Sequence, residues 1–373
     1  MRVEHMVKFL VKGFLNLVGF FAPIFQMLVY RCLPKKRVKI SELNEWDAQK
    51  YRFILVYVGF ATAIDDFAKD FLRDFKSRGA YVVFVTNNPA FKQSGDASAW
   101  MDVFIDNGNQ GWDFAQYKTA TAYLVKRLGA KVPSKIVYAN DSIFYIKRDK
   151  SAFVDRLLNE SFDFVGAFEI SGIARYSPWH VSGWLYSVSR ELFLSDQFQN
   201  FWLRYLPIKN KRHAIRKGEH KLTQAALSFS GKYDVIYSNA YLIESLKRSV
   251  ENRGQLEASE LISSSFHDLW EQKFWRGMEG DGVIPFVTEN LYRFSPLHVF
   301  LMLLLIDEGF PFIKKDLFWL NSVTYDKLVE LDKVLRVISS DDVARKIKAF
   351  FLRKGRITEA DLKTRFLVHV GLR

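Results

Sequence analysis

Apolar and amphipathic segments alternate along the first part of the chain. Residues 52–58 and 81–86 are almost wholly apolar, which is typical of short strands that are buried on both faces of a sheet. Between them, phenylalanine and leucine recur at helical spacing over residues 64–77, and Gly79 ends this pattern. The pattern therefore predicts a strand, a helix and a second strand.

The alternation continues further along the chain. Residues 102–105 form another short apolar run, residues 113–128 have helical periodicity, and residues 135–140 are again mostly apolar. Strands that alternate with helices predict a mostly parallel sheet with helices on both faces. We therefore expect an α/β fold.

The second half of the chain is more mixed and suggests three regions. Residues 162–168 and 183–188 have the pattern of strands, and the remainder is largely helical. We expect residues 1–37 to form a membrane-associated helix with a basic flank and residues 50–245 to form the α/β core. Residues 246–373 should form a mainly helical region that packs on this core.

The amino-terminal segment is apolar with basic flanks. Residues 6–30 are almost continuously apolar and are followed by Arg31, Lys35, Lys36 and Arg37. The longest charge-free run is slightly short for a membrane span and contains a proline. An interfacial helix that holds the protein to an anionic membrane surface fits this pattern best. A helix packed on the core and a single spanning helix are the alternatives.

Composition narrows the classes of function. The net charge of +13 favours an acidic partner, such as anionic lipid, a phosphorylated substrate or nucleic acid. The single cysteine, Cys32, excludes an intramolecular disulfide framework and a CxxC zinc site, and it fits a reducing cytosol. The chain contains no HExxH, GxSxG, GxGxxG or Walker motif, so zinc proteases, α/β-hydrolases, dinucleotide folds and P-loops are not supported.

Polar residues follow directly on the apolar run at residues 135–140. Asn140, Asp141 and Ser142 close this predicted strand. In open α/β sheets, ligands bind beyond the carboxyl ends of the strands. A carboxylate at that position can hold a divalent cation against the phosphates of a nucleotide. A plain turn former or helix cap is the alternative interpretation of Asp141.

A glycine-rich turn precedes the helix predicted at residues 113–128. Gly108 and Gly111 allow the backbone to approach a ligand closely, and the start of the helix offers N–H groups to an anion. Asp113 stands at the start of this helix and could equally be an ordinary N-cap.

A third candidate region lies near residue 219. We expect an amphipathic helix over residues 219–229, which would place Glu219 at its amino terminus. The helix dipole would stabilise the carboxylate there, which suits a general base; an ordinary capping glutamate is the alternative. The basic stretch at residues 209–221 is either a solvated loop or a contact for a diphosphate or lipid headgroup. His180 is either near the site or a structural histidine.

Six motifs occur in one order between residues 52 and 316: N-x-G-x-D at Asn109, Gly111 and Asp113, N-D-S at Asn140, Asp141 and Ser142, D-F-x-G from Asp163, a strand led by His180, E-x-x-L from Glu219 to Leu222, and G-F-P-F-I-K from Gly309 to Lys314. This order resembles the rhamnan synthesis protein F family, which comprises glycosyltransferase-like proteins of bacterial surface-polysaccharide assembly. The chain departs from the family pattern at Asn107, where an arginine is usual, and at Ser182-Gly183, where a polar pair is usual.

The resemblance implies a fold of the GT-A type, a nucleotide-binding α/β sheet completed by an acceptor-binding half. It implies that Asp141 binds Mg²⁺ or Mn²⁺, as the aspartate of a D-x-D motif does, and that Glu219 is the catalytic base. The remaining motif residues would bind substrate: Asn109, Gly111, Asp113, Asn140, Ser142, Asp163 and His180.

Together these features predict a glycosyltransferase at the cytoplasmic face of the bacterial plasma membrane. It would transfer a sugar, for which the family name suggests rhamnose from a dTDP donor, to a lipid-linked or growing surface polysaccharide, with inversion as the simplest scheme. A non-catalytic scaffold of a polysaccharide assembly complex is the alternative. A nucleic-acid binder is disfavoured, because the aromatic residues lie mainly in apolar runs and are not interleaved with Lys and Arg.

Overall fold

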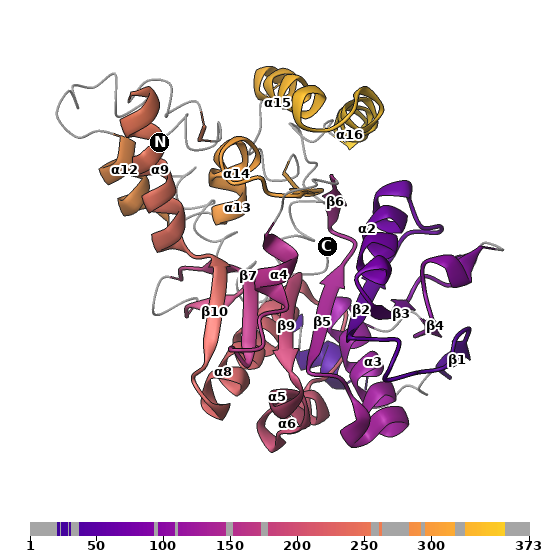
Figure 1. Cartoon of the computed structure of the whole chain (residues 1–373). Helices are drawn as coiled ribbons and strands as arrows, with labels where there is room; N and C mark the ends of the chain where they lie inside the picture. Colours follow the sequence, from indigo (N-terminus) through magenta and orange to yellow (C-terminus); the bar gives the residue numbers. More distant parts are fainter. Residues whose placement is uncertain are drawn as a thin grey trace, which may run out of the picture.

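A computed structural model describes the following residues: 21–22, 24–28, 30, 37–92, 96–108, 111–146, 152–172, 178–254, 261–262, 283–291, 295–317 and 325–354. Within them, the centre of the molecule is a nine-stranded sheet in the order β1-β4-β3-β2-β5-β9-β7-β10, with β8 paired to β7 (Figure 1). The strands are β1 (Lys39–Glu42), β2 (Phe53–Gly59), β3 (Ala80–Thr86), β4 (Val103–Asp106), β5 (Lys135–Asn140), β7 (Phe164–Ile170), β8 (His180–Val181), β9 (Leu185–Ser189) and β10 (Tyr233–Tyr237).

The sheet is parallel in its first half and mixed in its second. Strands β4, β3, β2 and β5 are parallel neighbours. Strand β9 runs antiparallel between β5 and β7, and β10 is parallel to β7. The predicted α/β fold is confirmed, whereas the reversed strand β9 was not expected from the sequence.

Helices pack on both faces of the sheet. The described helices include α2 (Asp66–Ser77), α3 (Asp113–Leu128), α4 (Phe153–Leu157), α5 (Arg190–Leu194), α6 (Asp196–Arg204), α7 (Lys211–His213), the π-helix η3 (Ala214–Glu219), α8 (His220–Phe229), α9 (Asn239–Arg253), α12 (Val283–Asn290), α13 (Pro296–Val299), α14 (Leu301–Ile306), α15 (Tyr325–Ile338) and α16 (Asp341–Lys354). Two short 3₁₀ turns are η1 (Ala97–Ala99) and η2 (Gly129–Lys131).

Strand β2 shows why the central strands are continuously apolar. Leu55 and Tyr57 pack in the same cluster as Phe71 of α2, whereas Val56 and Val58 pack on the opposite face with residues of α3. Because side chains alternate between the faces of a sheet and both faces are covered, every position of the strand must be apolar.

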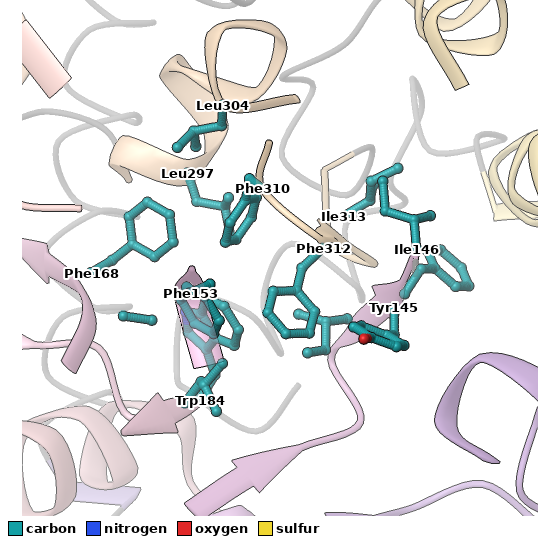
Figure 2. Packing of buried hydrophobic residues seen from close by; sticks show 14 of the residues in the cluster. Tyr145, Ile146, Phe153, Phe168, Trp184, Leu297, Leu304, Phe310, Phe312 and Ile313 are labelled. Atoms are coloured by element: carbon teal, nitrogen blue, oxygen red, sulfur yellow. The ribbon is translucent and has the colours of Figure 1, made fainter. Parts of the chain in front are cut away.

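The carboxyl-terminal part of the chain is joined to the sheet by aromatic packing. Strand β11 (Phe312–Lys314) pairs antiparallel with β6 (Ile143–Tyr145), which follows β5 directly. Figure 2 shows Phe310 and Phe312 facing Phe153, Phe168 and Trp184 of the core, and the rings of Phe168 and Phe310 are 5.4 Å apart. Such pairs contribute about 0.5–1.5 kcal/mol beyond burial. This packing brings the segment after α14 to the edge of the sheet at which β5 ends.

Helix α3 begins and ends at the predicted residues, and the predicted central strands match within two residues. The helix expected to begin at Glu219 does not: a helical stretch starts at Lys211 and continues through η3 and α8. The basic stretch, for which a solvated loop was one of two interpretations, is therefore largely helical. Asn210 caps this helix by accepting a hydrogen bond from the backbone N–H of His213, which is a signal that the sequence contains.

The predicted amino-terminal helix lies mostly outside the described residues. Those described between residues 21 and 30 are helical. In the part of the chain that is described, no helix combines the length and apolarity required to cross a membrane.

Candidate functional site

The candidate site lies at the point where the strand order reverses. After β2 the chain proceeds to β3 and β4 on one side, and it returns to place β5 on the other side of β2. Asp141 follows β5, and its Oδ2 atom accepts a 2.7 Å hydrogen bond from the backbone N–H of Phe60, just beyond β2. The carboxylate is thus fixed in the crevice where such sheets bind ligands, as its position in the sequence predicted.

A cavity of about 400 Å³ opens at this edge of the sheet. It brings together five of the predicted residues with Asp141 and residues from the second half of the chain. The lining residues are Val58, Phe60, Asn87, Gly111, Trp112, Asp113, Gln116, Asn140, Asp141, Ser142, Ser182, Trp184, Lys209, Lys211, Ala214, Ile215, Glu219, Lys314 and Asp316. Of the remaining calls, Asn109 lies outside the described residues.

Asn140 connects the two loops that carry the acidic residues. Its Nδ2 atom donates to Asp113 Oδ2 at 2.8 Å, and its Oδ1 atom accepts from the Ser142 backbone N–H at 3.1 Å. Because both ends of the amide are used, Asn140 fixes the Asp113 carboxylate relative to the tip of β5. Asp113 lies in the first turn of α3, and the N-cap position belongs to Trp112.

Gly111 is required by a close approach in the turn before α3. Its φ angle is +59°, and a Cβ atom there would lie 2.5 Å from the Cβ atom of Ala115 and 3.0 Å from the carbonyl oxygen of Pro207. Its own carbonyl accepts a 2.9 Å hydrogen bond from Asn87. The glycine therefore lets the turn pack against the segment that precedes Lys209.

Glu219 lies inside a helix and not at its start. It is the last residue of η3, eight residues after the helical stretch begins at Lys211. The proposed stabilisation of its carboxylate by a helix amino terminus is therefore wrong, because that effect is confined to the first turn. The π-helical geometry offers another explanation for its placement, since single π turns are frequent at functional sites.

His180 contacts the carboxylate of Glu219. The His180 side chain is 3% exposed, and its Nε2 atom lies 3.2 Å from Glu219 Oε2. Its Nδ1 atom lies 2.9 Å from the carbonyl oxygen of Pro178, which can only accept, so Nδ1 carries a hydrogen. His180 does not line the cavity, so its placement supports a contact with Glu219 and not the predicted contact with substrate.

His220 completes the surroundings of this pair. Its ring is 4.2 Å from that of His180, and burial together with the nearby His180 lowers the pKa of His220 to about 4. It is therefore neutral near pH 7.

Glycines make room for Glu219 and for the ring of Phe114. A Cβ atom at Gly183 would lie 2.7 Å from the Phe114 ring and 3.0 Å from Glu219 Cγ, and one at Gly218 would lie 2.8 Å from the same ring. The Gly183 backbone N–H also points at Glu219 Oε1, at 3.4 Å. Gly183, which departs from the family pattern, therefore contacts the candidate base directly.

This cavity carries more acidic than basic side chains, because Asp113, Asp141, Glu219 and Asp316 line it together with three lysines. Burial, and then the charge of Glu219, raise the pKa of Asp113 to about 6. Burial also raises the pKa of Asp141, an effect that the ammonium group of Lys315 opposes. The electrostatics therefore favour a positively charged group between these residues.

The lysines of the cavity had no role assigned from the sequence. Lys209 and Lys211 come from the basic stretch, for which contact with a diphosphate was one of two interpretations, and Lys314 comes from β11. Lys314 also lies 3.3 Å from Asp316, and His298 lies 3.0 Å from the other oxygen of that carboxylate. Although burial raises the pKa of Asp316, these two neighbours outweigh it and hold that pKa well below its usual range.

Two residues named from the sequence lie away from the cavity. Asp163 precedes β7 at the opposite edge of the sheet, where its Oδ1 atom accepts a 2.8 Å hydrogen bond from Ser189. This position does not match the predicted contact with the same substrate as Asp141. Asn107 is buried and accepts a 2.7 Å hydrogen bond from Thr119, so it acts within the turn.

The cavity offers few protein ligands to a metal ion. Within the described ranges, no group of three or more His, Cys, Asp or Glu residues could hold a metal ion. Asp141 nevertheless supplies carboxylate oxygen atoms, and Asp113 lines the same cavity. This donor set suits Mg²⁺ or Mn²⁺ bound through one or two carboxylates together with substrate phosphates, and it does not suit a cage made by the protein alone.

The middle of the chain matches a known protein family. Residues 82–251 match the family described as Rhamnan synthesis protein F. The resemblance predicted from the motifs is thereby confirmed over this range, which includes the cavity residues from Asn87 to Glu219.

Individual relatives are more distant. An uncharacterized protein, y4gN of Sinorhizobium fredii, is 26% identical over 154 residues, which are 41% of this chain and 40% of that protein. The virulence protein VirA of Vibrio anguillarum is 23% identical over 339 residues, covering 87% of this chain and 97% of that protein. The mannosyltransferase PcManGT from Pyrobaculum calidifontis, in complex with GDP-Man and Mn²⁺, aligns over 95% of both chains at 12% identity and a TM-score of 0.32. That score is too low to support an inference.

Proposed function

We propose that this protein is a glycosyltransferase of the GT-A type that uses a nucleotide-sugar donor in the synthesis of a bacterial surface polysaccharide. One observation carries the proposal: Asp141 and Glu219, from opposite halves of the chain, line one cavity at the carboxyl edge of the sheet. The family match over residues 82–251 supports the same class of reaction.

The donor would occupy the part of the cavity between the tips of β2 and β5. Lys209, Lys211 and Lys314 offer ammonium groups for the diphosphate. Asp141 would hold Mg²⁺ or Mn²⁺ together with the donor phosphates. When bound, such a cation neutralises charge that develops on the leaving nucleoside diphosphate.

Glu219 would act as the general base. Its carboxylate takes the proton from the attacking hydroxyl of the acceptor while that oxygen bonds to the anomeric carbon of the donor sugar. The bond from that carbon to the diphosphate breaks, and its electron pair stays with the phosphate oxygen. One base and one displacement give inversion.

His180 would position this base. Its contact through Nε2 engages one carboxylate oxygen of Glu219, which leaves the other oxygen, near the Gly183 N–H, for the acceptor proton. The acceptor would be a lipid-linked glycan, and the protein would work at the cytoplasmic face of the membrane. Rhamnose from a dTDP donor is the first candidate sugar.

Thermal unfolding with a panel of nucleotide sugars tests the donor and the cation together. A matching donor with Mn²⁺ should raise the Tm by roughly 5 °C at about one hundred times its Kd, because ligand that binds only the folded state stabilises it. Asp141→Asn should lose the part of this shift that depends on Mn²⁺, whereas Lys126→Gln, outside the cavity, should keep it. If no nucleotide sugar shifts the Tm in the presence of either metal, the proposal is wrong.

A transfer assay with the nucleotide sugars that bind separates an enzyme from a scaffold. Donor binding without transfer to any lipid-linked acceptor would favour the scaffold, for which the departures at Asn107 and Ser182-Gly183 are the motivating observations. The packing of Gly183 against Glu219 favours the enzyme.

A further inference from the structure

A second cavity of about 780 Å³ lies beside α6 and α8. Its exposed cations are Arg204, Lys217 and Lys221. The full lining is Met27, Gln197, Asn200, Phe201, Arg204, Tyr205, Leu206, His213, Lys217, Lys221, Gln224, Ala225 and Ser228. We call this cavity the basic groove, since no carboxylate is found among these residues.

The cations of the basic groove are available to a ligand. Within the described residues, neither Arg204 nor Lys217 forms an ion pair with a carboxylate, and Lys221 donates only to the neutral side chain of Gln224, at 2.8 Å. Three exposed cations with no carboxylate among the lining residues attract an anion, and Lys and Arg bind phosphate readily.

The basic groove and the candidate active site share one helical stretch. Lys211, Ile215 and Glu219 line the acidic cavity, whereas Lys217 and Lys221 line the groove. Residues two positions apart point to different sides of a helix. Occupation of the groove would therefore place its ligand across one helix from the candidate base.

An apolar stripe lies next to the basic groove. Phe21, Ile24, Phe25 and Leu28 are 54%, 44%, 68% and 56% exposed, respectively. Their spacing of three, one and three residues places them on one face of the helical segment at residues 21–30. We call these four residues the apolar stripe.

Two other residues of the same helical segment, Gln26 and Met27, contact the groove or the chain beside it. Gln26 Nε2 donates to the carbonyl oxygen of Lys209 at 3.3 Å, and Met27 lines the groove. The apolar stripe is therefore held beside the three cations, and not at a distant part of the molecule.

We propose that the apolar stripe and the basic groove together dock this protein on an anionic phospholipid bilayer, with lipid phosphates in the groove and the stripe among the upper acyl chains. The combination decides the partner. A free phosphate would need no stripe, and a second copy of this strongly basic chain would be repelled by the groove. A helix with a large apolar face beside basic residues is the arrangement that binds at the headgroup boundary.

This proposal extends the proposed function. Docking on a membrane does not depend on the transferase assignment, but its consequence for access of the acceptor rests on that assignment. A docked protein would have the groove at the membrane and Glu219 on the other face of the same helix. The sugar end of a lipid-linked acceptor could then reach the base while its phosphates stay near the bilayer. Membrane binding itself can be measured without any transfer reaction.

Vesicle flotation of the full chain tests the docking surface. The probes are vesicles of phosphatidylcholine alone and vesicles with equal parts of phosphatidylcholine and phosphatidylglycerol. We expect wild type to float with the mixed vesicles and to be released by high salt. Lys217→Gln with Lys221→Gln should weaken this binding roughly tenfold, because each basic residue near an anionic surface adds to the attraction. Phe25→Ser with Leu28→Ser should weaken binding to both vesicles at least as much.

Matched variants control for charge and for exposed apolar area. Lys126→Gln with Lys131→Gln removes two lysines outside both cavities, and Val337→Ser changes a residue that is 86% exposed. Both should float as wild type does, and far-UV circular dichroism establishes that every variant is folded.

Three results would overturn the proposal: equal flotation with both vesicles, unchanged flotation of the groove and stripe variants, or a stripe variant that loses only self-association in sedimentation. The second result would place any anchor elsewhere in the chain, and the third would identify the stripe as a contact between copies. Asp141→Asn should float normally, so a failure of docking is distinct from a failure of the transferase assignment.

Discussion

The two cavities on either side of the helical stretch at residues 211–229 have opposite character. One holds the carboxylates of Asp113, Asp141 and Glu219, and burial together with the charge of Glu219 raises the pKa of Asp113 to about 6. The other carries three exposed cations and no lining carboxylate. Charges in a partly buried cavity interact strongly, whereas exposed charges are screened by salt. One helix can therefore serve both a site that requires fixed geometry and a surface that requires only net charge.

The largest expected effect on transfer activity is loss of the candidate base, Glu219, from one of the two cavities. Glu219→Gln keeps the size of the side chain but cannot accept the acceptor proton, so transfer should fall by about a thousandfold. Vesicle binding should not change. Lys217→Gln is the matched variant on the other face, and with a short water-soluble acceptor it should retain transfer activity. A Glu219→Gln enzyme with undiminished turnover would remove the acidic cavity from the mechanism.

A second difference concerns the support of the base. His180→Asn keeps a donor near Pro178 but cannot reach Glu219, whereas His180→Gln can place its amide where Nε2 lies. We expect His180→Asn to lower kcat about fiftyfold with little change in the KM for the donor, because misplacement of a catalytic group by about 1 Å can cost about a hundredfold. His180→Gln should recover much of this loss. Equal losses in both variants, or a change in KM alone, would indicate a purely structural histidine.

The smallest expected effect is on stability and its dependence on pH. Because the pKa of Asp113 is about 6 in the folded protein and about 3.9 in an unfolded chain, the folded state holds an extra proton between these values. The contribution of this group to the free energy of unfolding therefore falls as the pH rises from about 4 to about 6. Asp113→Asn should be more stable than wild type by about 1–2 kcal/mol at pH 7, and this advantage should vanish near pH 4. Thermal unfolding at both pH values measures this, and a difference that is independent of pH would contradict the assignment. Lys217→Gln, in the basic groove, should show no such dependence.

The sequence predicted the first half of the molecule well because its signals are local. The strands β2, β3 and β5 are buried on both faces, so their apolar runs are unbroken, and the residues that follow them necessarily lie at one edge of a parallel sheet. Asp141 could therefore be placed in the crevice before any coordinates were known.

The second half was harder to predict for an equally physical reason. The basic residues at 209–217 looked like a solvated loop, yet one face of this stretch closes the cavity and the other lines the basic groove, so it folds as a helix whose apolar content is low. The predicted strand at residues 162–168 placed Asp163 near its beginning, but the sequence did not indicate at which edge of the sheet that end lies. Strand direction decides that edge, and strand direction is a property of the whole sheet.

By itself, the sequence determined the α/β alternation, the acidic residue at the tip of β5 and the apolar character of the amino-terminal segment, since each follows from residue order and periodicity. Only the tertiary structure decided which distant residues meet. It set Glu219 against His180, brought Lys314 from β11 to the cavity and placed Met27 beside Lys217. Such contacts depend on strand order and on how helices pack across a sheet, and neither is encoded at any single position of the chain.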